Sequence, residues 1–233
     1  PDYVENNCVY VKIAQITRTA SSVRGDAVLV HNPILQGFKP FQSFFKPRKG
    51  HTDIKFVPYQ KSNSMETYLG LDLGGTKLLI GEVDTHGNIL KYKKYASGFF
   101  DQQTALEIIK ASLDDYIQTV GWSSEKPEAM GVGLVGRVDP DAGIWFQIDP
   151  HRTYPMALAK ELSDIYQIPC RIDNDVKSAT RAERVWGVGQ FSKNFIYINV
   201  GTGIAVGTVV NGRQIRGSHF NAGEAGHTRV GVN

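Results

Sequence analysis

Cysteine is scarce in this sequence, and long apolar runs are missing from it. The 233 residues include only Cys8 and Cys170. Two cysteines this far apart cannot form the disulfide framework of a small secreted domain, and they lack the close spacing of a zinc knuckle. No apolar run approaches the roughly 20 residues of a transmembrane helix, and the N-terminus lacks the basic-then-apolar order of a secretory signal. We therefore expect a cytoplasmic protein with reduced thiols and no membrane contact.

The charge of the chain is small and unevenly distributed. Apolar residues make up 41% and charged residues 21%, which is typical of a globular protein. Residues 1–64 hold nine Lys/Arg and four Asp/Glu, a net charge of +5, so the total of +3 leaves −2 for residues 65–233. The basic residues are dispersed and accompany no nucleic-acid motif, which favours a solvated surface over a nucleic-acid partner.

Residues 1–64 differ in kind from the rest of the chain. They carry five of the ten prolines, and they show strand-like runs at "CVYVKIAQIT" and "DAVLVHNPIL" but no helical pattern. The polar joint "KSNSM" ends in Met65, a natural translation start. We interpret residues 1–64 as a basic, proline-rich extension of unknown role, either a separate module or foreign to the domain that begins at Met65.

From Met65 onward, strands alternate with helices. The segment "LGLDLGGTKLLIGEVD" (69–84) predicts a β-hairpin that turns at Gly74-Gly75. Apolar spacing predicts helices at 101–122, 157–167 and 176–187, with further strands at 129–139, 168–175 and 194–217. We expect Asp101 to cap the first of these helices and Gly187 to end the last. This order predicts an α/β sheet, in which ligands collect at the carboxyl ends of the strands.

Two glycine turns offer groups that suit a phosphate. In "DLGGTK" (72–77), φ > 0 at Gly74 and Gly75 would point successive amides into one concavity beside the Thr76 hydroxyl and the Lys77 ammonium. In "NVGTGI", Gly201, Thr202 and Gly203 offer the same groups, so the two turns together could hold a polyphosphate. Asp72 could hold Mg²⁺ through water. Neither turn is a Walker P-loop, because no G-x-x-x-x-G-K-[ST] string occurs.

Each of these features also has an ordinary structural interpretation. Most Gly-Gly hairpins are only turns. Asp72 could be a turn-stabilising carboxylate, and Lys77 a solvated strand residue.

Four motifs occur in one order: "DLGGTK", "IDND" (172–175), "NVGTGI" (199–204) and "AGEAGH" (222–227). In this order, over about residues 67–232, the chain resembles the ROK family of sugar kinases and sugar-responsive repressors. The resemblance implies the actin-like, ribonuclease H-like ATPase fold. Residues 65–185 would form the first lobe, and residues 186–233 would begin the second.

The resemblance also implies roles for the motif residues. Asn174 and Asp175 would contact the sugar, with Asp175 as catalytic base and Asp173 in place of the family's Glu. Glu224 and His227 would bind further sugar hydroxyls, while Gly136 and Arg137 would lie near the C2 side of the sugar. A base is needed because a sugar hydroxyl is a poor nucleophile at neutral pH. The alternative for Asp175 is that it caps the helix beginning at Val176.

The implied activity is ATP-dependent phosphorylation of a hexose or N-acetylhexosamine at its primary hydroxyl, with Mg²⁺, by a homodimer. The family's structural zinc would bind His227 and a cysteine cluster, which this sequence does not contain. The family's adenosine-binding segment also lies beyond Asn233. Two alternatives stay open: a sugar-responsive transcriptional repressor, and a catalytically silent sugar-binding fragment. The extension lacks the paired helices of a helix-turn-helix reader, which favours the kinase.

Overall fold

The computed structural model of the chain describes residues 65–98, 101–149, 151–200, 203–229 and 231. The predictions for the extension and for Gly201 and Thr202 lie outside these residues. Within the described residues, no helix is both long and apolar enough to cross a membrane.

A five-stranded sheet forms the centre of the described structure, in the order β3-β2-β1-β4-β7. Its strands are β1 (Thr67–Leu73), β2 (Lys77–Asp84), β3 (Ile89–Ala96), β4 (Ala129–Leu134) and β7 (Cys170–Asn174). The predicted hairpin is confirmed, because β1 and β2 pair antiparallel from Thr67–Asp84 to Leu73–Leu78. The strands β1, β4 and β7 run parallel, as an α/β sheet requires. The edge strand β3 was not predicted.

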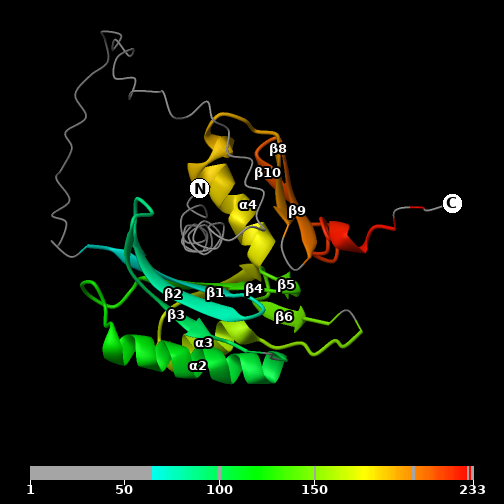
Figure 1. Cartoon of the computed structure of the whole chain (residues 1–233). Helices are drawn as coiled ribbons and strands as arrows, with labels where there is room; N and C mark the ends of the chain where they lie inside the picture. The colour runs from blue at the N-terminus through cyan, green and yellow to red at the C-terminus, as the bar shows by residue number, and fades with distance from the viewer. Residues whose placement is uncertain (1–64, 99–100, 150, 201–202, 230, 232–233) are drawn as a thin grey trace, which may run out of the picture.

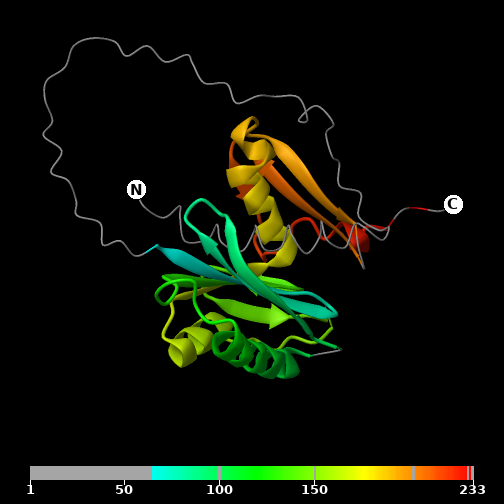
Figure 2. The ribbon, with the colours of Figure 1, turned by 60° about the vertical axis from the view of Figure 1, so that its left-hand side comes forward.

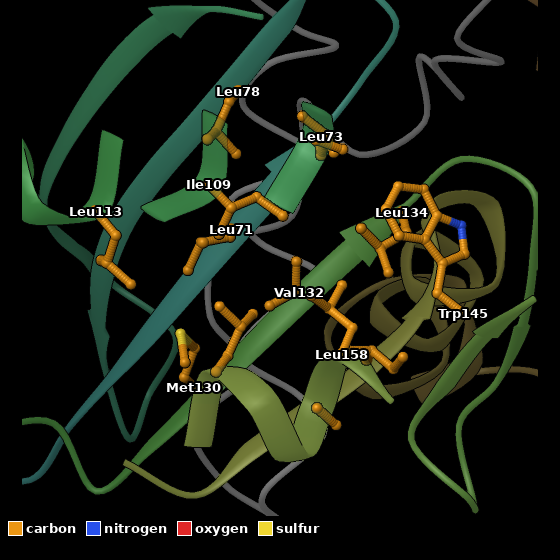
Figure 3. Packing of buried hydrophobic residues seen from close by; sticks show 14 of the residues in the cluster. Leu71, Leu73, Leu78, Ile109, Leu113, Met130, Val132, Leu134, Trp145 and Leu158 are labelled. Atoms are coloured by element: carbon orange, nitrogen blue, oxygen red, sulfur yellow. The ribbon is translucent and has the colours of Figure 1, made fainter. Parts of the chain in front are cut away.

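Two helices cover one face of this sheet (Figure 1). These are α2 (Gln102–Thr119) and α3 (Leu158–Tyr166). Asp101 caps α2 as predicted, since its side chain accepts the Thr104 N–H at 2.8 Å. Figure 3 shows the apolar core between sheet and helices, where Leu71, Val132 and Ile109 are at most 1% exposed. Burial of these side chains is the main force that holds both helices on the sheet.

The opposite face of the sheet carries α4 (Asp175–Trp186), which leads to a second, three-stranded sheet (Figures 1 and 2). That sheet has the order β10-β9-β8, with β8 (Phe195–Val200), β9 (Ile204–Val210) and β10 (Arg213–Ile215). Gly187 is the C-cap of α4, as predicted. A small hairpin of β5 (Arg137–Asp139) and β6 (Ile144–Gln147) completes the described strands.

One face of the second sheet packs on α4, and the other is apolar and exposed. The pairing of β8 with β9 and of β9 with β10 places alternate residues on the exposed face. The apolar residues exposed there are Ile196, Ile198, Val200, Ile204, Val210 and Ile215. The α4 side holds Gly207 and Val209, both buried.

Replacing Gly207 by Ala is expected to lower the free energy of unfolding by about 1–3 kcal/mol. A Cβ at this position would lie 2.6 Å from the Cβ of Thr180 on α4, an atom that no rotation of the Thr side chain can move away. The helix and β9 would therefore have to separate. Urea unfolding measures the loss. Gly75→Ala is the control, because its Cβ would meet nothing within 4 Å; equal stability of the two variants would contradict the prediction.

Candidate functional site

Three of the predicted motifs follow the ends of neighbouring parallel strands. Leu73 of β1 pairs with Leu134 of β4, which pairs in turn with Asn174 of β7. These residues stand in one row at the carboxyl ends of the three strands. Segments 74–77 and 135–137 and the start of α4 therefore leave the sheet at the same end. The structure thus brings the first turn, the Gly136 segment and Asp175 to the carboxyl ends of the strands, where ligands bind in α/β sheets.

The first glycine turn has a different backbone from the predicted one. Neither Gly74 nor Gly75 has φ in the positive range, so that part of the prediction is wrong. The conformation of the turn is instead held by hydrogen bonds, including two from Ser97, which lies in a different segment. The Gly74 N–H donates to Lys77 O at 2.9 Å, while Ser97 donates its N–H to Thr76 O and its hydroxyl to Gly74 O. Gly75, Thr76 and Lys77 are exposed at the sheet edge, where they are accessible to a phosphate.

Metal binding has only limited support in the described residues. No group of three or more His, Cys, Asp and Glu side chains among them could hold a metal ion. The zinc implied for His227 does not fit, because a structural zinc needs four ligands. Magnesium makes a weaker demand, since it keeps several waters and needs one or two carboxylates besides the phosphates. Asp72, half-exposed in β1 and in register with Gly133, fits that weaker demand.

The Gly136 segment is held close to the β5–β6 hairpin. Gly136 has φ of +90°, and a Cβ there would overlap the carbonyl oxygen of Gln147. Only glycine meets both conditions without strain. The next residue, Arg137, places its guanidinium 4.5 Å from the centroid of the Phe146 ring. Its Nε is buried and has no hydrogen-bond partner in the described structure. The structure therefore leaves this donor of Arg137 unsatisfied.

Asn174 is the N-cap of α4, and Asp175 is the first residue of the helix. The Asn174 Oδ1 accepts the N–H groups of Val176 and Lys177, both at 3.1 Å. The interpretation of Asp175 as the cap is therefore wrong. The Asn174 Nδ2 donates to Gly136 O at 3.0 Å, which joins the two segments and leaves one amide N–H of Asn174 for a substrate.

The Asp175 side chain is half-exposed at the sheet edge. One carboxylate oxygen accepts the Val176 N–H at 2.8 Å, which orients the group. The positive end of the α4 dipole stabilises its ionised form. Asp175 is thus an oriented carboxylate that a ligand can reach.

Ionic groups lie around Asn174 and Asp175, and the sequence patterns identified neither Arg216 nor Lys177 among them. Asp173 is 7% exposed and receives both Arg216 Nη atoms, at 2.8 and 2.6 Å. Burial alone would lower the pKa of Arg216, but the hydrogen bonds and charge of Asp173 raise it. Lys177 is 2% exposed, and desolvation lowers its pKa despite the nearby carboxylates of Glu224 and Asp173. A Lys in the first turn of a helix, against the helix dipole, is the one local signal that could have identified it.

Glu224 and His227 follow β10 and lie beside β9. Gly223 has φ of +90°, and its O accepts the Val206 N–H at 2.7 Å. Glu224 Oε1 lies 3.9 Å from Lys177 Nζ, and the Glu224 side chain is 39% exposed. His227 is exposed in a short 3-10 turn (Ala225–His227). The structure therefore places Glu224 beside the first turn of α4.

Curated proteins similar to this chain include two sugar kinases. A glucokinase of Halalkalibacterium halodurans is 28% identical over 167 residues, which are 70% of this chain and 50% of that protein. A beta-glucoside kinase of Listeria monocytogenes is 32% identical over 157 residues, covering 67% of this chain and 51% of that protein. The DNA-binding transcriptional dual regulator NagC of Escherichia coli is 26% identical over 162 residues, covering 70% and 40%. The chain spans about half the length of the curated kinases that it matches.

Solved structures give the same result. A ROK family glucokinase from Streptomyces griseus, in complex with glucose and AMPPNP, has a TM-score of 0.59 at 28% identity, covering 70% of this chain and 51% of that one. A ROK family transcriptional regulator, a homologue of the E. coli MLC protein, has a TM-score of 0.62 at 25% identity, covering 71% and 42%. The sequence profile of the ROK family matches residues 68–233. The chain therefore belongs to the ROK family and has the actin-like α/β fold of its sugar kinases.

Proposed function

We propose that this chain carries the catalytic base of an ATP-dependent kinase that phosphorylates a hexose or N-acetylhexosamine at its primary hydroxyl. The observation that carries the proposal is the position of Asp175. It is an oriented, half-exposed carboxylate at the first turn of α4, in the row of strand ends that also carries the first glycine turn. Similarity to kinases of glucose and of beta-glucosides supports the reaction class.

The proposed reaction needs a group that takes the proton of the sugar hydroxyl as it attacks the γ-phosphorus. Asp175 fits that role because its carboxylate is oriented by the Val176 N–H and is half-exposed, so that a sugar hydroxyl can reach it. Proton transfer from the hydroxyl to Asp175 makes the oxygen a better nucleophile. The new O–P bond then forms as the bond to the leaving ADP oxygen breaks.

The phosphates would bind along the glycine turns. We assign Gly74, Gly75, Thr76 and Lys77 to one side of the polyphosphate, and Gly201, Thr202 and Gly203 to the other. Bound Mg²⁺ would neutralise phosphate charge, and Asp72 would hold it through water. Charge neutralisation and in-line positioning are the main contributions that a protein makes to phosphoryl transfer.

The sugar would bind between the end of β7 and the loop after β10. The remaining amide N–H of Asn174 and the carboxylate of Glu224 are a donor and an acceptor for hydroxyls. Arg137, with its unpaired Nε, and Gly136 would lie near C2, and His227 would bind a further hydroxyl. Several oriented partners would select between sugars that differ only in hydroxyl orientation.

A coupled ADP-release assay with Mg-ATP and a panel of hexoses and N-acetylhexosamines tests the proposal. We expect ADP release that depends on one sugar class and saturates with its concentration. ATP without sugar is the control for background hydrolysis. Folded protein that binds a sugar but releases no ADP with any member of the panel would contradict the kinase.

A sugar-responsive regulator is the second candidate. Similarity to NagC and to the MLC homologue favours it, because both of those proteins are named as transcriptional regulators. Sugar-dependent DNA binding without ADP release would support this candidate.

A further inference from the structure

The segment 216–222, which leads to Glu224, is fastened at both ends. At its start, Arg216 forms the two-point ion pair with Asp173. At its end, Ala222 O accepts a hydrogen bond from Lys177 Nζ at 2.7 Å. The two ends are also joined to each other, since the Ala222 N–H donates to Arg216 O at 3.1 Å. The segment is therefore a closed loop with two anchors.

Both anchors lie next to Asn174 and Asp175 along the chain. Asp173 immediately precedes Asn174, and Lys177 is two residues after Asp175. Any movement of the loop relative to Asp175 would have to break a hydrogen bond to a charged group, and such bonds are stronger than neutral ones.

Helix stability does not explain why Lys177 is there. It lies in the first turn of α4, where the helix dipole disfavours a cation, and its side chain is 2% exposed. Burial of an ammonium is costly unless it is paired and hydrogen-bonded. The only hydrogen bond described for Lys177 Nζ goes to Ala222 O, and the nearest described carboxylate is Glu224 at 3.9 Å.

We propose that Lys177 is a positioning residue for sugar binding, whose buried ammonium holds Ala222 and Glu224 at a fixed place relative to Asp175. The inference rests on the proposed function of Glu224 and Asp175. Lys177 touches no substrate in this scheme. It fixes the sugar-binding carboxylate, while the exposed part of Glu224 faces the solvent from which a sugar would enter.

The test compares the whole chain with its Lys177→Met variant. Met keeps an unbranched side chain of similar length but has no charge and no N–H. Glu224 remains partly solvated, so the variant leaves no buried charge unpaired, and we expect its thermal stability to be retained. Lys160→Met is the matched control, because Lys160 is exposed on α3 and pairs only with Asp164 among the described residues.

Hydrogen–deuterium exchange reads the loop directly and needs no turnover. In Lys177→Met we expect exchange over residues 217–226 to become about tenfold faster, because a hydrogen bond to a charged group contributes about one order of magnitude to an opening equilibrium. The five-stranded sheet should keep its protection, as should all segments of Lys160→Met. Unchanged exchange in the loop would overturn the proposal. Faster exchange throughout the chain would also overturn it, since Lys177 would then be a general core residue.

Titration calorimetry, with the sugar that the panel selects, tests whether Lys177 contributes to sugar binding. We expect the Kd of Lys177→Met to rise about tenfold, with the Lys160→Met value equal to that of the unaltered chain. Where turnover is measurable, KM for the sugar should rise while kcat stays within about threefold. Equal sugar Kd in both proteins would overturn the sugar role. If the unaltered chain binds the sugar and Lys177→Met weakens both sugar binding and loop protection, but no ADP is released, only the proposed kinase activity is contradicted. Failure of the Lys177 proposal can therefore be told apart from failure of the proposed kinase activity.

Discussion

Replacement of Asp175 by Asn is expected to reduce sugar-dependent ADP release by about 10²- to 10⁴-fold, the usual contribution of a general base. Asn has nearly the same shape, and its Oδ1 can still accept the Val176 N–H that orients the Asp175 side chain. The helix cap is unaffected, because Asn174 provides it. The variant therefore keeps the shape and this hydrogen bond of Asp175 while it removes the basicity and the negative charge of the carboxylate. Steady-state rates at saturating Mg-ATP and sugar measure the loss.

Two controls make that result specific. Asp164→Asn removes an exposed carboxylate on α3 and should leave the rate unchanged. Calorimetric sugar binding by Asp175→Asn should fall by much less than the rate, because the base acts mainly in the transition state. Turnover in Asp175→Asn at more than about a tenth of the original rate would assign the base to another residue.

The sequence predicted the elements whose apolar spacing is regular. The helix at 101–122 was identified from such spacing, and the structure contains α2 at Gln102–Thr119 with its predicted cap. The edge strand β3 was missed because "ILKYKKYA" places lysines where a strand pattern needs apolar residues. One of these lysines is stabilised by α2, where Lys93 and Tyr95 both donate to the Asp115 carboxylate. A local sequence pattern does not show hydrogen-bond partners that lie about 20 residues away.

The site was predictable only as far as strand ends determine it. Parallel register brings the "DLGGTK" and "IDND" motifs to one edge, so their proximity follows from the fold class. The backbone at Gly74 and Gly75 does not follow, because Ser97 of a different segment holds the carbonyls of this turn. The ionic groups around Asn174 were equally hidden, since Arg216 lies 43 residues from Asp173 along the chain.

The relation between α4 and the second sheet also depends on tertiary contacts. The sequence shows "NFIYINV" and "IAVGTVV" as apolar strands, but apolar residues on both faces do not tell which face is buried. The close approach of Gly207 to Thr180 decides it, because only a residue without a side chain lets α4 lie that near to β9.

Replacement of Arg216 by Met is expected to lower the free energy of unfolding by about 3–5 kcal/mol, the cost of leaving a buried charge unpaired. The side chain of Asp173 is only 10% exposed, and in the variant it would keep just the hydrogen bond from the Asn174 N–H. Urea unfolding measures the loss. Arg213→Met is the matched control, since Arg213 is exposed on β10 and its removal should change stability by less than about 0.5 kcal/mol.

The double variant Asp173→Asn with Arg216→Met measures the interaction between the two side chains apart from the contribution of each one alone. Because it removes both charges, it should be more stable than Arg216→Met alone by at least about 1 kcal/mol. A double variant as unstable as the sum of the two single variants would show that Asp173 and Arg216 contribute independently.

In Lys177→Met, by contrast, the partner carboxylate of Glu224 remains partly in water. The two anchors of the 216–222 segment should therefore differ in kind. Loss of the Arg216 anchor should unfold the protein more readily, whereas loss of the Lys177 anchor should release the sugar-binding loop and leave the fold intact.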